Sequence, residues 1–310
     1  MEHRGLGRTG IEVSRLVLGC GNFGGIGSSP AFFGQGETEE QAGAIMDAAW
    51  EAGITTFDTA DAYGGGRSET FIGNWLRSRG VRPVLTTKTF NPMEEGAESG
   101  LSRERIRRQI GTSMERLGVE RIDLYLAHAM DPATPVAETA AALDELRREG
   151  SIGAWGGSNV DAPWVEETRP AWVQNSYSLL DREDEADVLP LCAREGLGYT
   201  PFSPLAGGWL TGKYRRDEEP PAGSRMTFRP EPYEHLRNER TYDSLEAFEA
   251  IAAERGTTPA TLALAWLLAQ PHVAAVVVGA RRPEQLRPAL DALELQLSPK
   301  EAGTVAAVFE

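Results

Sequence analysis

Four polar side chains of this sequence lie at or just beyond the points where strand-like stretches end. Asp58 closes the run ITTFD, Lys88 closes LTTK and His128 closes DLYLAH, while Tyr63 follows Asp58 in a glycine-rich loop. The runs are short, apolar and rich in β-branched residues, which is typical of buried strands. In a parallel α/β fold the carboxyl ends of the strands meet at one edge, so we expect these four side chains to converge.

A convergent set of this kind suits proton donation to a carbonyl oxygen. A free tyrosine has a pKa near 10, but an ammonium group beside it stabilises the phenolate and makes loss of the proton easier. Lys88 can supply that charge, and the Asp58 carboxylate can keep a buried lysine cationic. His128 can hydrogen-bond a substrate oxygen and fix it near Tyr63.

Each residue also has a simpler interpretation when it is taken alone. Asp58 can cap the next turn, Lys88 can be a surface lysine, and His128 can be a hydrogen-bonded histidine of the core. A lysine at the end of a barrel strand is also the arrangement of enzymes that form a Schiff base. The chemistry therefore depends on the fold that positions these side chains.

Apolar periodicity and turn residues predict alternating strands and helices along the chain. A hairpin at 5–20 leads into strands at 16–18, 54–57, 84–87, 122–126, 152–156, 172–174, 198–202 and 273–278. Helices are predicted after Thr38, at 68–79, 102–117, 136–149, 161–168, 183–195, 241–255, 258–269 and 283–292, and after Ser298. This pattern favours one domain over residues 1–310, a (β/α)8 (TIM) barrel with an N-terminal β-hairpin and extra C-terminal helices.

Glycine-rich and irregular segments refine this picture. Gly19, Gly21 and Gly24 spell G-x-G-x-x-G after the first strand, but the following residues 25–36 are loop-forming, whereas a Rossmann motif requires a helix there. We therefore reject a Rossmann unit. The long irregular segments 91–100 and 214–240 follow strands and are expected to cover the site.

Charge and composition exclude several classes of function. The formal net charge of −15 and the pI of about 4.9 disfavour broad nucleic-acid or membrane surfaces. The basic run at 103–108 alternates with Glu104 on a predicted helix and is interpreted as a solvated outer face. Neither the two distant cysteines nor the scattered histidines indicate a disulfide framework or a metal site. No leader-like or membrane-spanning run is apparent, so a cytoplasmic protein is expected.

The motifs taken together are similar to those of the aldo-keto reductases over nearly the whole chain. They are FDTADAYGGGRSE, LTTK, IDLYLAH, GSN, QNSYS, PFSPLAGGWLTGKY, and ALAWLL followed by VVVGARRPEQL. The resemblance implies a (β/α)8 barrel in which Tyr63 is the general acid, Lys88, Asp58 and His128 complete a catalytic tetrad, and a nicotinamide cofactor delivers hydride. It thus implies NADPH-dependent reduction of an aldehyde or ketone, or the reverse oxidation.

The same resemblance implies the residues that hold the cofactor. Ser158, Asn159 and Gln174 match positions around the nicotinamide carboxamide, and Phe202 matches an aromatic that stacks on the ring. The remaining expected contacts are Gly21, Asn22, Asp58, Ser203, Leu205, Gly207 and Lys213.

A last segment, Gly279 to Arg282, matches the phosphate-binding stretch at the start of the final barrel helix. Arg281 and Arg282 are available to a 2′-phosphate, with Gln285 one turn later, and they favour NADP over NAD. The family usually has Glu-Asn where this chain has Pro288 and Ala289.

Two alternatives remain open at this stage. Lys88 could form a Schiff base in a lyase, or the chain could be a nicotinamide-sensing regulatory subunit similar to the potassium-channel β subunits. The expected partner is a small carbonyl compound, and the sequence leaves its identity and the oligomeric state open.

Overall fold

A short antiparallel hairpin closes the end of the barrel at which the strands begin. In the computed structural model, which describes residues 1–310, β1 (His3–Gly5) pairs with β2 (Glu12–Ser14). The hairpin falls where the sequence predicts it. Leu6 and Val13 are buried in the same apolar cluster as Trp172 of the barrel interior.

Eight parallel strands form the wall of the barrel. They are β3 (Leu16–Gly19), β4 (Thr56–Asp58), β5 (Val84–Thr89), β6 (Ile122–Ala127), β7 (Ile152–Ser158), β8 (Trp172–Gln174), β9 (Gly198–Tyr199) and β10 (Val276–Gly279). The sheet runs β10-β3-β4-β5-β6-β7-β8-β9. Backbone hydrogen bonds from Ala274 N to Tyr199 O (2.9 Å) and from Val277 N to Pro201 O (3.0 Å) join its two edges. The predicted (β/α)8 barrel is thus confirmed.

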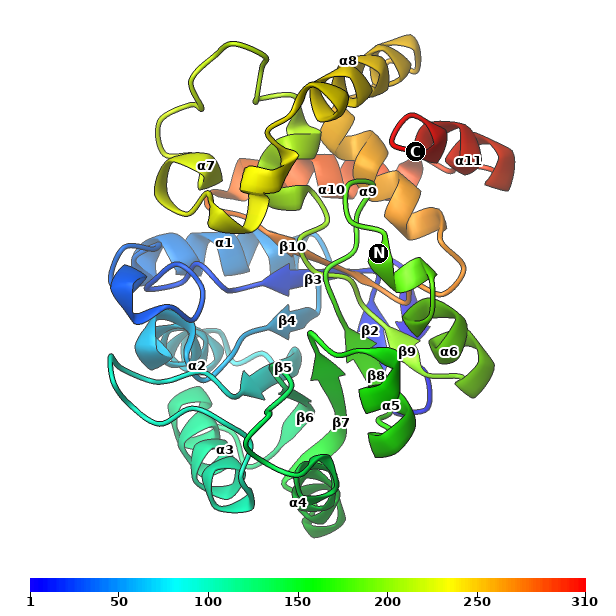
Figure 1. The fold of residues 1–310 in the computed structure, drawn as a ribbon. Helices are drawn as coiled ribbons and strands as arrows, with labels where there is room; N and C mark the ends of the chain where they lie inside the picture. Colours follow the sequence, from blue (N-terminus) through cyan, green and yellow to red (C-terminus); the bar gives the residue numbers. More distant parts are fainter.

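The helices surround this wall (Figure 1). They are α1 (Glu39–Glu51), α2 (Arg67–Arg79), α3 (Arg103–Leu117), α4 (Val136–Glu149), α5 (Ala162–Thr168), α6 (Val188–Glu195), α7 (Arg225–Phe228), α8 (Glu239–Glu254), α9 (Pro259–Ala269), α10 (Arg287–Glu294) and α11 (Pro299–Ala307). The helix predicted after Thr38 is present as α1, and Thr38 and Gln41 form a capping box at its start. None of these helices has both the length and the apolar composition needed to cross a bilayer.

Several predicted boundaries differ from the structure for local reasons. The predicted helix 183–195 is divided into a 3₁₀ turn, Glu183–Glu185, and α6, because the backbone leaves the helical region at Asp187. The helix predicted to begin at Thr241 begins at Glu239, since the side chain of Asn238 caps it by accepting the N–H of Thr241. The segment 214–240 also contains α7 and a 3₁₀ turn.

One part of the predicted solvated basic face is wrong. Arg103, Arg107 and Arg108 are exposed and pair with glutamates, but Arg105 is 1% exposed. Its guanidinium donates to Thr89 Oγ1 (2.8 Å) and to the backbone oxygens of residues 91 and 100. Positions 103 and 107 share a helix face, whereas position 105 lies about 200° away and faces the barrel.

Candidate active site

A buried ion pair forms the base of the site. Side chains alternate along a strand, so Asp58 of β4 and Lys88 of β5 both point into the barrel. Lys88 Nζ lies 2.5 Å from Asp58 Oδ1 and 2.9 Å from the carbonyl oxygen of Thr59. The other carboxylate oxygen accepts a hydrogen bond from Gln174 Nε2 at 2.9 Å. Asp58 is therefore held on both sides, and Lys88 keeps a carboxylate and a carbonyl as partners.

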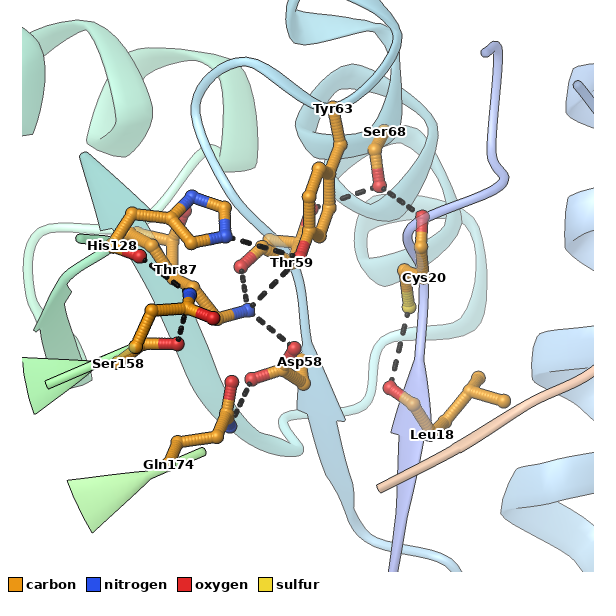
Figure 2. A network of polar contacts seen from close by, with 12 residues as sticks. Leu18, Cys20, Asp58, Thr59, Tyr63, Ser68, Thr87, His128, Ser158 and Gln174 are labelled. Atoms are coloured by element: carbon orange, nitrogen blue, oxygen red, sulfur yellow. Dashed lines mark hydrogen bonds and ion pairs between the residues drawn. The ribbon is translucent and has the colours of Figure 1, made fainter. Parts of the chain in front are cut away.

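Tyr63 reaches this pair from a tight turn that glycine makes possible. Tyr63–Gly66 form a 3₁₀ turn in which Gly64 and Gly65 have φ values of 60° and 69°. A side chain at Gly64 would collide with the backbone of the loop after β3, which packs closely there. The Tyr63 hydroxyl lies 3.5 Å from Lys88 Nζ and 3.4 Å from His128 Nε2. Figure 2 shows Tyr63, His128 and Asp58 directed toward a common centre.

Burial and charge set the protonation states of the pair Lys88 and Tyr63. Burial disfavours the ammonium of Lys88, but Asp58 and Tyr63 outweigh it and raise the pKa of Lys88 above its usual value. Burial raises the pKa of Tyr63 and outweighs the opposing effect of Lys88. As expected, Lys88 lowers the pKa of Tyr63. The net pKa of Tyr63 is nevertheless raised, because burial has the larger effect. The phenol keeps its proton at neutral pH and can donate it.

His128 is held neutral in a defined orientation. Burial first, and the nearby Lys88 charge second, lower the pKa of His128 well below its usual value. Asn91 Nδ2 lies 3.2 Å from His128 Nδ1. Because an amide nitrogen can only donate, Nδ1 is the acceptor and the ring proton is on Nε2, which faces Tyr63. The site thus presents two donors, the phenol and the imidazole N–H, to the same space.

The structure brings all four expected side chains of the tetrad together. The three residues expected around the carboxamide lie beside them. Asn159 Nδ2 donates to the backbone oxygen of His128 (2.8 Å) and to Ser158 Oγ (3.2 Å). Gln174 donates its amide to Asp58, so its carbonyl oxygen is the group that remains available to a ligand.

The loop that carries the expected cofactor contacts Ser203, Leu205 and Gly207 has an unusual backbone. Within Ser203–Gly208, four residues have positive φ values: Ser203 (52°), Ala206 (45°), Gly207 (64°) and Gly208 (100°). Successive backbone N–H groups in such conformations form concave anion sites. Tyr233 covers this loop, since its hydroxyl lies 3.1 Å from Ser203 Oγ and a side chain at Gly207 would collide with its ring.

Cations gather beside this loop. The Lys213 ammonium lies 5.0 Å from the Tyr214 ring centroid, and a side chain at Gly208 would collide with it. Burial, together with Arg225 and Arg281, lowers the pKa of Lys213. Burial and the neighbouring arginines likewise lower the pKa of Arg225. Neither Lys213 nor Arg225 has a carboxylate within salt-bridge distance, in contrast to most arginines of this acidic chain. Such uncompensated charge suits a phosphate-bearing ligand.

The structure also places each of the other residues that were expected to contact the cofactor. Gly21 faces the Tyr63 ring, and Phe202 packs against the apolar interior of the barrel. Gly279 pairs with Gly19 in the barrel wall, while Leu205 precedes the 3₁₀ turn Ala206–Thr211. The Asn22 carbonyl accepts the N–H of Glu37, and Gln285 accepts the backbone N–H of Arg281. Arg281 and Arg282 are both exposed, and Arg281 pairs with Glu37.

Sequence reasoning missed three residues that contribute to these arrangements. Asn91 could have been found, because it follows β5 three residues after Lys88 and so lies at the same edge of the barrel. Arg225 and Glu37 carried no such signal, because Arg225 lies in the long segment 214–240 and Glu37 lies far along the loop that follows β3.

Comparison with known proteins agrees with this geometry. Residues 15–310 match the aldo/keto reductase family. The chain is 38% identical over 320 residues to an uncharacterized oxidoreductase, YrpG, of Bacillus subtilis, covering 96% of this chain and 92% of that protein. It is 36% identical over 316 residues to the NADH-specific methylglyoxal reductase of Escherichia coli, covering 96% and 95%. It is 33% identical over 331 residues to a probable voltage-gated potassium channel subunit beta of Oryza sativa subsp. japonica, covering 100% and 97%. The chain belongs to the aldo/keto reductase family of oxidoreductases.

Proposed function

We propose that this oxidoreductase reduces the carbonyl group of a small aldehyde or ketone with a nicotinamide dinucleotide, or catalyses the reverse oxidation, with Tyr63 as the proton donor. The observation that carries the proposal is the position of the Tyr63 hydroxyl, 3.5 Å from a buried ammonium and 3.4 Å from an imidazole N–H. A phenol between two such groups is suited to donate a proton and to be stabilised as phenolate.

The roles of the residues follow from their contacts. A substrate oxygen at this centre accepts hydrogen bonds from Tyr63 and from His128 Nε2, which orient the carbonyl. As negative charge develops on that oxygen, Tyr63 transfers its proton, and the Lys88 ammonium stabilises the phenolate that remains. Asp58 pairs with Lys88 and keeps it charged. When bound, the reduced nicotinamide supplies the hydride that attacks the carbonyl carbon.

The residues present fit such a cofactor. The positive-φ loop at Ser203–Gly208 and the unpaired cations Lys213 and Arg225 suit a pyrophosphate, while Ser158, Asn159 and Gln174 offer both donors and acceptors to a carboxamide. The sequence favours NADP on the basis of two arginines. Of the arginines at positions 281 and 282, only Arg282 has no carboxylate partner, so the proposal extends to NADH as well as NADPH.

The substrate proposed is a small carbonyl compound. The E. coli relative is named for methylglyoxal, a small aldehyde, which makes methylglyoxal a suitable first member of a substrate panel. The lyase alternative is disfavoured, because a Schiff base requires a neutral amine and Asp58 holds Lys88 as an ammonium.

A regulatory subunit that senses the nicotinamide redox state is the second candidate. It is favoured by the similarity to a probable potassium channel subunit beta along the whole chain. The two candidates differ in turnover, since a sensor binds the cofactor without rapid multiple-turnover reduction of free aldehydes.

Replacement of Tyr63 by phenylalanine tests the proposal. We expect the wild-type protein to oxidise NADH or NADPH in the presence of methylglyoxal or an aromatic aldehyde, and Tyr63→Phe to lower kcat by a factor of about 10³. Cofactor binding, measured by quenching of tryptophan fluorescence, should be retained. Tyr125→Phe is the matched control, because the Tyr125 hydroxyl is buried on the other side of the wall without a hydrogen-bond partner. Equal activity of Tyr63→Phe and the wild type would refute the role of Tyr63.

A further inference from the structure

Arg281 is engaged by other residues of the protein, although its side chain stays 43% exposed. Its Nε lies 2.6 Å from Glu37 Oε1, and its Nη1 donates to the carbonyl oxygen of Gly223 at 3.1 Å. Its guanidinium carbon lies 5.5 Å from the centroid of the Phe228 ring. These contacts join the loop after β3, the segment 214–240 and the start of the last barrel helix. Arg281 therefore has an internal role that its position in the sequence does not reveal.

Glu37 cannot release Arg281 easily. Its side chain is 3% exposed, and its second carboxylate oxygen is buried without a hydrogen-bond partner. Separation of the pair leaves a buried carboxylate in a medium that disfavours charge. Burial raises the pKa of Glu37 and outweighs the opposing effect of Arg281. The same burial disfavours separation of the pair. The pair of Glu37 and Arg281 is thus a stable contact between the segments that follow β3 and β10.

By the resemblance of the segment Gly279 to Arg282 to a phosphate-binding stretch, a 2′-phosphate is the part of a dinucleotide cofactor that would lie near this pair. A phosphate monoester carries between one and two negative charges at neutral pH and gains most from an arginine that is free to pair. Here the phosphate must either share Arg281 with Glu37 or displace that carboxylate, and in both cases it lies close to a negative charge. A 2′-hydroxyl, as in NADH, meets neither difficulty.

We propose that Glu37 is a specificity-determining residue that disfavours the 2′-phosphate of NADPH by holding Arg281, so that this chain binds NADH at least as tightly as NADPH. The inference rests on the proposed nicotinamide cofactor and reverses the preference that the two arginines favour in the sequence.

Glu37→Gln is the sharpest test. A glutamine keeps an oxygen that accepts from Arg281 Nε but removes the charge, so Arg281 can pair with a phosphate. We expect the ratio of NADPH affinity to NADH affinity, measured by fluorescence quenching, to rise about tenfold in this variant. The same change should appear with adenosine 2′,5′-bisphosphate compared with adenosine 5′-monophosphate, which differ only in the 2′-phosphate and undergo no turnover.

Two further variants complete the design. Glu40→Gln makes the same change of charge at an exposed residue of α1 that makes no hydrogen bond, and it should leave the ratio unchanged. Glu37→Gln combined with Arg281→Met should return the ratio to the wild-type value, because the arginine that accounts for the gain is then absent.

Three results would contradict the inference. They are a wild-type protein that binds NADPH tenfold more tightly than NADH, a ratio within twofold of wild type in Glu37→Gln, and a gain that persists in the double variant. The proposed function fails by a different result, which is a wild-type protein that binds neither NADH nor NADPH at millimolar concentration. A wild-type protein that turns over an aldehyde through Tyr63 but shows no change in Glu37→Gln would refute this inference alone.

Discussion

Two buried groups of charged side chains lie on opposite sides of the strands β4 and β5. On the inner side, the pair Asp58 and Lys88 contacts Tyr63 and Gln174. On the outer side, Asp61 and Glu69 meet residues of α3, with Gln109 Nε2 3.1 Å from Asp61 Oδ2 and Arg116 Nη1 3.2 Å from Glu69 Oε2. Alternation along β5 produces both groups, because Lys88 points inward and its neighbours Thr87 and Thr89 point outward.

The two groups differ in how completely their polar atoms are bonded. Both oxygens of Asp58 accept hydrogen bonds, and Lys88 has a carboxylate and a carbonyl as partners. On the outer side, Asp61 Oδ1 and Arg105 Nε are buried without partners, while Arg105 binds the loop that carries Asn91. Beside the inner group, the Tyr63 hydroxyl and His128 Nε2 are donors that face the same space. The outer group holds the loops that bring Tyr63 and Asn91 there.

Loss of Lys88 should have the largest effect, because it should lower both the catalytic rate and the stability of the fold. In Lys88→Met we expect kcat for aldehyde reduction to fall by a factor of about 10³, because no cation stabilises the phenolate. The free energy of unfolding should also fall by about 3 kcal/mol, since the buried Asp58 carboxylate is left with Gln174 alone. Denaturant unfolding and steady-state kinetics measure the two effects.

The double variant Asp58→Asn/Lys88→Met sharpens this result. Removing both charges should restore most of the stability but none of the rate. The surface pair of Arg79 and Asp47 provides the control, because Arg79→Met should change the free energy of unfolding much less than Lys88→Met. A double variant with near wild-type kcat would mean that the inner charges serve folding only.

The inner group could be predicted from the sequence, and most of the outer group could not. Asp58, Lys88 and His128 each end a strand-like run, so strand polarity alone brings them to one edge. Arg105 looked solvated because its neighbours on the helix are charged, although its face is the one turned to the barrel. Glu37 and Arg281 are 244 positions apart, in segments that follow the paired strands β3 and β10, and no local pattern signals their contact.

The outer group should make stability depend on pH through Asp61. Burial, then the charge of Glu69, raises the pKa of Asp61 to about 7, against the opposing effects of Thr89, Arg105 and Gln109. A carboxyl whose pKa is higher in the folded state stabilises the fold while it is protonated, so its contribution is lost as pH rises from about 4 to about 7. Asp61→Asn removes that loss. We expect it to raise the free energy of unfolding by about 2 kcal/mol more at pH 8 than at pH 5.

Urea unfolding at the two pH values measures this difference. Part of the pH dependence should remain in the variant, because burial also raises the pKa of Glu69. The control Asp47→Asn changes a partly exposed carboxyl that pairs with Arg79 and should not reproduce the effect. If Asp61→Asn and the wild type differed in stability by the same amount at pH 5 and pH 8, Asp61 would be ionised at both. The outer group would then not make stability depend on pH.

The smallest effect is expected where the two groups meet, at Asn91. Its backbone oxygen accepts from Arg105 of the outer group, and its side-chain amide donates to His128 of the inner one. Asn91→Ala keeps the backbone contact but frees His128 Nδ1, so the neutral imidazole no longer carries its proton only on the nitrogen that faces Tyr63. We expect kcat/KM for an aldehyde to fall about tenfold, the value of one hydrogen bond, with cofactor affinity and stability nearly unchanged. Asn74→Ala on the outer surface is the control, and a loss of stability without a change in kcat/KM would instead place Asn91 with the outer group.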